Sequence, residues 1–110
     1  MSILPQAQQR TLETPYGQAI GASFSWNGGQ YCAIHTDRGV VGCGIYDIDC
    51  ANEFDMAFAL AKGTPENPLR QPEDLYQAQI VKVSKAAESI GISVGMTGME
   101  AVEKMLSDFA

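Results

Sequence analysis

The segment from Cys43 to Asp47, Cys-Gly-Ile-Tyr-Asp, holds the most suggestive chemistry in this 110-residue chain. A thiol and a carboxylate there flank the end of a predicted strand. A nucleophilic cysteine needs a base or a positive environment to form its thiolate, and the sequence places no base nearby. Strand alternation directs Cys43 into an apolar face. The sequence therefore favours a buried core thiol over a reactive nucleophile, and it favours turn and capping duty for Asp47.

A second candidate is the glycine-rich segment from Gly91 to Gly98, which leads into a predicted helix. Backbone N–H groups at a helix N-terminus can bind an anion, and Gly95, Thr97 and Gly98 are the candidate ligand-binding residues there. The spacing matches neither the dinucleotide-binding pattern nor the P-loop. Thr97 and Glu100 also have the form of a capping box, so an anion site and a purely structural connection both stay open.

Metal and histidine chemistry have less support. The three cysteines form no C-x-x-C pair and His35 is the single histidine, so we expect no metal site and no cofactor. His35 shares its predicted sheet face with no serine or cysteine partner. A hydrogen-bonding role at an interface is therefore favoured over a general base. The odd number of cysteines fits a reducing compartment, and we expect a cytoplasmic location.

The charge of the chain argues against two classes of partner. The formal net charge is −6, and seven scattered basic residues do not form the Lys/Arg cluster that nucleic acid or an anionic membrane requires. No apolar run approaches the ~20 residues of a membrane span. Charged residues make up 18% of the chain, below the roughly 25% of typical domains. Part of the surface is therefore expected to be covered.

The elements that position these residues differ between the two halves of the chain. Asn27-Gly28-Gly29 predicts a hairpin turn between strands at 19–26 and 30–36; a third strand is expected at 40–46 and a weaker one at 10–13. Helical periodicity predicts helices over 49–63, over 79–90 and from Thr97 onward, with a Pro-rich loop at 63–72. Residues 1–9 are predicted to be a loose leader. Residues 10–110 are predicted to form one α+β domain, an N-terminal antiparallel β-meander followed by about three helices packed on one face of the sheet.

Both faces of the predicted sheet are apolar. One carries Cys32, Ile34, Val41 and Cys43, and the other carries the residues expected at an oligomer interface: Phe24, Trp26, Tyr31, His35 and Tyr46. A sheet that is apolar on both sides needs a layer on each. The helices can cover one face, and another copy of the chain is the expected cover for the aromatic face. The alternative is that helices wrap both faces.

Two motifs resemble a known family. They are Asp37-x-Gly-Val-Val-x-Cys-Gly-x-x-Asp47 and Ala86-Ala-Glu-x-x-Gly-Ile-x-Val-Gly-Met-Thr-Gly-x-Glu-Ala101. In this order and at this separation they resemble the YunC-like family of small uncharacterised bacterial and archaeal domains. The resemblance implies an α+β fold whose N-terminal β region builds a homotetramer. It brings no established reaction, cofactor or catalytic residue.

Three functional interpretations follow from these patterns. The favoured one is an uncharacterised oligomeric domain that works as an interaction or assembly module, with itself as partner. The first alternative is a small enzyme whose site lies at a subunit boundary and uses Cys43, Asp47, His35 and the turn at 95–98. The second is a sensor of a small anionic ligand bound at that turn. Whether the chain is an enzyme is left open.

Overall fold

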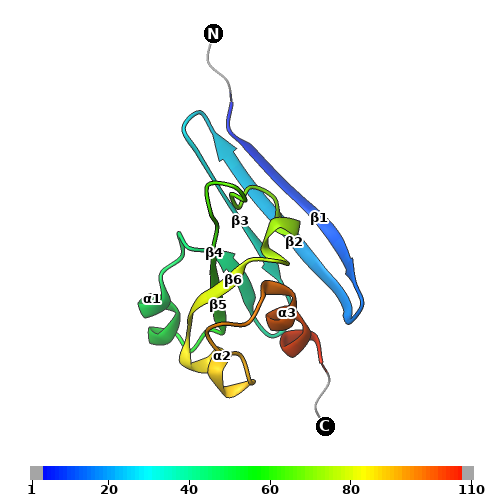
Figure 1. Ribbon diagram of the computed structural model, residues 1–110, viewed down its shortest axis with the longest axis vertical. Coiled ribbons are helices and arrows are strands. Elements are labelled where there is room, and N and C mark those ends of the chain that lie inside the picture. The colour runs from blue at the N-terminus through cyan, green and yellow to red at the C-terminus, as the bar shows by residue number, and fades with distance from the viewer. Residues whose placement is uncertain (1–3, 108–110) are drawn as a thin grey trace.

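Four strands at the N-terminus pair with one another in chain order. β1 (Gln6–Thr14), β2 (Gly17–Trp26), β3 (Gly29–His35) and β4 (Val40–Cys43) are antiparallel neighbours in the computed structural model, which describes residues 4–107 (Figure 1). Gly28 has φ +130° in the β2–β3 turn, a backbone conformation that glycine adopts without a steric penalty. The predicted hairpin is therefore confirmed.

The predicted leader is wrong for its last four residues. Residues 6–9 belong to β1 and pair with residues 22–25 of β2. Residues 1–3 of that leader, like residues 108–110 of the predicted domain, lie outside the described part of the chain. The weaker strand predicted at 10–13 lies within β1, but residues 6–9 were missed because the β1 sequence, Gln-Ala-Gln-Gln-Arg-Thr-Leu-Glu-Thr, has only one large apolar residue, Leu12. An edge strand of this composition lacks a regular alternation of apolar and polar residues.

Two further strands replace parts of the predicted helices. β5 (Phe58–Lys62) pairs in parallel with β4, and β6 (Gln79–Val83) pairs antiparallel with β5, so the sheet has six strands in the order β1 to β6. The helices are shorter than predicted: α1 (Ile48–Glu53), the 3-10 helix η1 (Pro72–Leu75), α2 (Lys85–Ser89) and α3 (Gly98–Leu106). The α+β class is confirmed, whereas a meander followed only by helices is wrong.

The main core lies on one face of the sheet. It combines the inward side chains of the strands with apolar residues of η1, α2 and α3; the fully buried larger members are Ile34, Val41, Leu75, Ile80, Ile92, Val102 and Met105. Gly21 lies under η1, and an added Cβ there would come within 2.9 Å of both Pro72 and Leu12. The absence of a side chain at this position lets η1 pack closely on β2.

α1 packs on the opposite face from this core. Leu60 points away from its neighbours Ala59 and Ala61, yet only 1% of it is exposed, and it lies outside the main core. Ala51 of α1 is also buried outside that core, and α1 contacts β5. Figure 1 shows α1 apart from α2 and α3. The prediction that about three helices pack on one face is therefore wrong, because α1 covers β5 from the other side.

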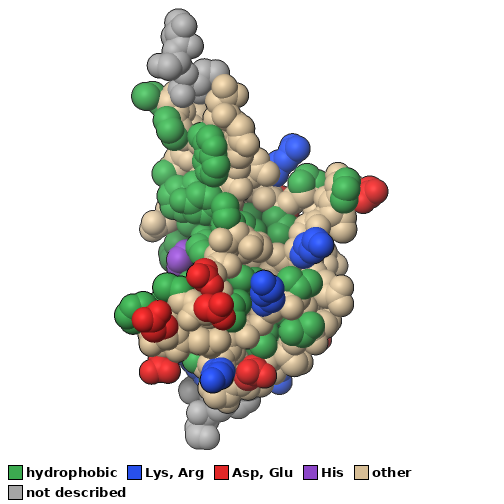
Figure 2. Space-filling model, turned by 90° about the vertical axis from the view of Figure 1, so that its left-hand side faces the viewer, with side chains coloured by type: hydrophobic (Ala, Val, Ile, Leu, Met, Phe, Trp, Pro, Cys, Tyr) green, Lys and Arg blue, Asp and Glu red, His purple; other side chains and the backbone are tan. Residues whose placement is uncertain are grey.

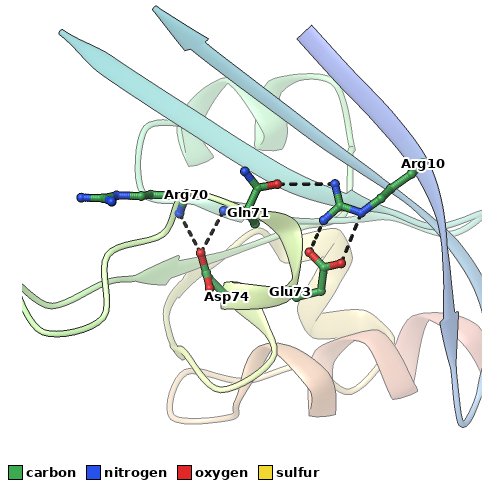
Figure 3. A network of polar contacts seen from close by, with 5 residues as sticks. All are labelled: Arg10, Arg70, Gln71, Glu73 and Asp74. Carbon is green, nitrogen blue, oxygen red and sulfur yellow. Dashed lines mark hydrogen bonds and ion pairs between the residues drawn. The ribbon is translucent and has the colours of Figure 1, made fainter. Parts of the chain in front are cut away.

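A polar network joins β1 to η1 (Figure 3). The guanidinium of Arg10 donates to both carboxylate oxygens of Glu73, and its Nη1 lies 3.4 Å from Oε1 of Gln71. The Asp74 carboxylate accepts from the backbone amides of Arg70 and Gln71 at 3.0 and 2.9 Å. These contacts hold the start of η1 beside the edge strand.

The strands β1, β2 and β3 extend beyond the helical layer. In Figure 1 the tip of the β2–β3 hairpin and the start of β1 project above the helices. Within residues 4–107 the helices are too short or too polar to cross a bilayer. The helices therefore leave the projecting parts of β1, β2 and β3 uncovered on both faces of the sheet.

Candidate functional site

An aromatic surface runs across the face of the sheet that lacks η1, α2 and α3; we define it as Phe24, Trp26, Tyr31, Tyr46 and Phe58. Tyr31 lies at its centre. Its ring stacks on Phe24 with centroids 4.8 Å apart and meets the edges of Trp26 and Tyr46 at 5.9 and 6.1 Å. Tyr46 extends the surface to Phe58 at 5.7 Å. Such offset and edge contacts are favourable arrangements of aromatic rings.

Strand pairing and two glycines place these rings. Phe24 pairs directly with Tyr31, so their side chains share a face. Trp26 pairs with Gly29, where an added Cβ would lie 2.5 Å from the indole ring, and a Cβ on Gly42 would lie 2.6 Å from the ring of Tyr46. The two rings therefore occupy the space that side chains at positions 29 and 42 would fill.

The aromatic surface is partly exposed and uncharged. Trp26 is 46% exposed, and Phe24, Tyr31 and Tyr46 are partly exposed. Burial raises the pKa of Tyr46 to about 12, with a smaller contribution from Cys43, so its hydroxyl stays neutral at physiological pH. On the side of the molecule that carries α1, hydrophobic side chains gather over the upper strands, while acidic side chains gather below them (Figure 2). His35, exposed at the end of β3, pairs with Ile20 and Val40 on the same face.

The opposite face brings two cysteines together. Ala33 pairs with Gly42 and Ile34 with Val41, so the next position of this register sets Cys32 opposite Cys43. Cys32 is fully buried and Cys43 is 7% exposed. The Cys32 thiol and the backbone amide of Ile45 both lower the pKa of the Cys43 thiol. The predicted burial of Cys43 is confirmed, but its buried neighbour is a second thiol.

These contacts separate the acidities of the two thiols. The hydrogen bond from Cys32 lowers the pKa of Cys43 to about 6, against the opposing effect of burial, and the backbone amide of Ile45 adds to the decrease. The same hydrogen bond raises the pKa of Cys32, and burial raises it further. A hydrogen bond to the charged form of a group favours that form, whereas desolvation disfavours it. Cys43 is therefore the thiolate of the pair near neutral pH.

The other predicted ligand residues, outside the Cys32–Cys43 pair, cap helices or allow close packing of the backbone. Asp47 is the N-cap of α1, and its carboxylate accepts from the amide of Asp49 at 2.9 Å. Thr97 and Glu100 form the predicted capping box of α3, with amide contacts of 2.9 and 3.1 Å. An added Cβ on Gly98 would lie 1.8 Å from the carbonyl oxygen of Leu75, so glycine is needed where α3 meets η1. The structure brings neither Asp47 nor His35 into the cysteine pair.

The backbone amides of the turn at 95–98 already donate hydrogen bonds within the protein. The amides of Gly95 and Gly98 donate to Ile80 and Ala78 of the β6 region, each at 2.9 Å. Met96 donates to Ser93, and Thr97 donates to the Glu100 carboxylate. Gly95 has φ +102° with open space around it, as a tight turn requires. An anion at this turn would have to displace contacts that hold α3 against the sheet.

Sequence reasoning missed two parts of this site. Phe58 falls within the predicted helix over 49–63, although it lies in β5 and extends the aromatic surface. The opposition of Cys32 and Cys43 could have been predicted from the short connection at 37–39, because both residues were already placed on one face.

A polar cleft of about 170 Å³ lies on the face of the sheet that carries the two cysteines. It borders them at Ser23, the β2 partner of Cys32, and its lining residues are Gln6, Gln8, Ser23, Ser25, Gln30, Arg70 and Gln71.

The fold and these two features define an α+β domain with an uncovered aromatic sheet face and a buried dithiol. The chain belongs to the family described as a domain of unknown function (DUF1805), whose model matches residues 42–105. It is 34% identical over 76 residues to the uncharacterised protein YunC of Bacillus subtilis (strain 168), covering 69% of this chain and 74% of that one. The predicted resemblance is thereby confirmed, and neither description assigns a reaction.

The architecture is also similar to that of a solved structure. The crystal structure of TA1206, a protein of unknown function from Thermoplasma acidophilum, superposes with a TM-score of 0.80 at 17% sequence identity. The match covers 92% of this chain and 94% of that one, so it includes most of the N-terminal strands that lie outside the family match. At this identity the likeness concerns the fold alone.

Proposed function

We propose that this chain is an assembly module that forms a homo-oligomer through the aromatic surface. The observation that carries the proposal is the partly exposed cluster of Phe24, Trp26 and Tyr31 on strands that project beyond the helices. Contiguous apolar surface of this kind marks interaction sites, and aromatic residues are enriched at their centres. Burying these rings against a partner would supply the missing layer on this face.

Charge favours a second copy as the partner. Along β1, β2 and β3 this face carries a single charged residue, Glu13, at the end remote from Trp26. The chain has a net charge of −6, so two copies repel unless their contact avoids the acidic residues. A face whose one charged residue lies at the end remote from Trp26 meets that condition, whereas nucleic acid and anionic membranes would meet an acidic molecule. We expect this assembly to work in the cytoplasm.

A tetramer is the favoured assembly. A two-fold contact uses one surface on both copies, and a closed tetramer of this symmetry needs a second kind of contact. β1 is an edge strand of the sheet, and its outer backbone groups are the natural second contact. Face-to-face packing of the aromatic surfaces and edge-to-edge pairing of β1 together would close four copies.

The mass of the purified chain tests this proposal. We expect sedimentation equilibrium to give four times the 11.8 kDa of the chain, or twice that mass at high dilution. Trp26→Glu places an uncompensated charge in the contact and should shift the mass to that of a monomer or of a dimer joined through β1. The matched control is Val94→Glu, which adds the same charge at a 59% exposed apolar residue outside the aromatic surface.

Circular dichroism must show that both variants keep their secondary structure. A wild-type chain that sediments as a monomer at micromolar concentration would refute the proposal. Equal effects of the two substitutions would also count against it, because the loss would then follow from added charge and not from the aromatic surface.

A further inference from the structure

The cysteine pair lies in a row of small side chains that crosses the core face of the sheet. Cys32 pairs with Ser23 on one side, and Cys43 pairs with Ala61 on the other. η1 packs over β3 and β4 on this face. Serine and alanine leave the two sulfur atoms as the largest groups of the row. This arrangement is independent of the aromatic surface, which lies on the other face.

The register gives the pair the geometry of a cross-strand disulfide. Directly opposed residues of antiparallel strands have Cα atoms about 4.5 or 5.5 Å apart. A disulfide requires a Cα separation of roughly 4.4–6.8 Å, so both kinds of opposed position satisfy it. Both side chains belong to the same buried core, so the two thiols face one another within it. Closing an S–S bond here requires side-chain rotation and no change of strand register.

We propose that Cys32 and Cys43 form a reversible disulfide with hydrogen peroxide as the oxidant, so that this chain carries a peroxide-responsive dithiol. Cys43 is the residue that reacts with the oxidant, since Cys43 is slightly exposed whereas Cys32 is fully buried. The oxidant must be small, because 7% of Cys43 is all that solvent reaches. The lowered pKa of Cys43 supports this order, because the thiolate is the nucleophilic form.

The chemistry balances in two steps. The Cys43 thiolate attacks one peroxide oxygen, the O–O bond breaks, hydroxide leaves, and Cys43 becomes a sulfenic acid. The Cys32 sulfur then attacks the Cys43 sulfur, the S–O bond breaks, and water leaves with the thiol proton of Cys32. One S–S bond forms, the two cysteines lose two electrons, and the peroxide gains them. A dithiol reductant reverses the step through a mixed disulfide.

The experiment uses the full chain with Cys50→Ser, because Cys50 is exposed on α1 and reacts separately. We expect hydrogen peroxide to remove both remaining thiols, and peptide mapping to give an intramolecular link between the Cys32 and Cys43 peptides. Dithiothreitol should restore both thiols. A link between different chains, or two thiols that survive treatment while the exposed Cys50 of the unsubstituted chain is oxidised, would overturn the proposal.

Two further variants fix the order of events, with circular dichroism to confirm folding. In the Cys50→Ser background, Cys32→Ala should stop the reaction at a sulfenic acid on Cys43, which dimedone traps when the oxidised chain is unfolded in its presence. Cys43→Ala should leave the Cys32 thiol unreacted under the same treatment. Dimedone labelling of Cys32 in place of Cys43 would contradict the assigned order. The peptide map of the Cys50→Ser chain remains decisive if either core substitution prevents folding.

Discussion

Cys43 differs from Cys50 in the groups that surround its sulfur. Cys50 is exposed on α1, whereas Cys43 is buried in the sheet, where the Cys32 thiol and the Ile45 amide lower its pKa. No residue near Cys43 in the sequence suggests this environment. The groups that lower its pKa are a residue eleven positions earlier, on the next strand, and a backbone amide that the sharp bend after β4 directs at the sulfur.

The pKa of Cys43 makes stability depend on pH. The folded chain holds this pKa at about 6, below the ordinary value of 9.0, so between these pH values it releases a proton that the unfolded chain keeps. The free energy of unfolding should therefore rise as the pH increases from about 6 toward 9, and this gain should be lost as the pH falls through about 6. Above about pH 9, the raised pKa of Cys32 should instead lower the free energy of unfolding as the pH increases.

Urea melts of the reduced Cys50→Ser chain from about pH 5.5 to 8.5 measure this dependence. The comparison is with Cys43→Ala in the same background, which removes the titrating thiol. The difference in unfolding free energy between the two chains should grow with pH. A difference that stays flat across this range would mean that Cys43 keeps an ordinary pKa.

At the scale of elements, β5 shows where sequence reasoning reached its limit. Phe58 to Lys62 reads Phe-Ala-Leu-Ala-Lys, a composition that favours helix, and its apolar residues also fit helical spacing. In the structure both faces of β5 are covered, by the main core on one side and by α1 on the other. A strand covered on both faces has a continuous apolar run, which periodicity cannot distinguish from a buried helix.

The helix ends were more predictable than the elements between them. Thr97 begins α3 with the predicted capping box, because that motif is local in sequence. The N-cap of α1 is Asp47, for which the sequence favoured turn and capping duty, although the predicted helix began at 49. α1 ends near Asp55, which has φ +56°, well before the predicted end at residue 63. The predicted helix over 79–90 failed because Ser84 caps α2 and leaves residues 79–83 to β6. The aromatic face was predictable because tight turns fix the register.

Ser84 and Thr97 are both N-caps, yet they should differ in what they stabilise. The fully buried Ser84 hydroxyl donates to the carbonyl of Met56 at 2.7 Å and accepts from the amides of Phe58 and Ala87. Ser84→Ala should therefore lower stability by roughly 2–4 kcal/mol, because a buried donor and acceptor lose their partner along with the cap. Thr97→Ala should cost roughly 0.5–2 kcal/mol, the usual loss for a cap alone.

Denaturant melts rank these variants. Ser89→Ala is the control, since the exposed Ser89 hydroxyl donates only to the Ala86 carbonyl of its own helix, and its substitution should leave stability nearly unchanged. Thr97→Ser should restore most of the stability that Thr97→Ala loses, because it keeps the accepting hydroxyl. Equal losses for Ser84→Ala and Thr97→Ala would show that the contacts of Ser84 to β5 add nothing to its capping role.

At the scale of the whole molecule, the chain divides into a covered lower sheet and projecting upper strands. The lower strands lie between α1 on one face and the main core on the other. The upper parts of β1 to β3 have aromatic side chains on one face and, on the other, a polar cleft that Arg70 and Gln71 at the start of η1 also line. Strands that bury little apolar surface open locally at a low free-energy cost. A partner on the aromatic surface would raise that cost in the assembled protein.

Amide hydrogen exchange measured at several protein concentrations tests whether assembly raises the free-energy cost of opening the projecting strands. We expect the amides of Phe24 and Tyr31 to exchange slowly in concentrated protein and faster on dilution, because assembly by mass action stabilises the contacting strands. The amides of Leu60 and Val102 should be insensitive to dilution, since the chain's own core covers them. In Trp26→Glu the fast exchange should persist at every concentration. Exchange at Phe24 and Tyr31 that is slow and independent of concentration in both chains would show that the projecting strands are stable without a partner.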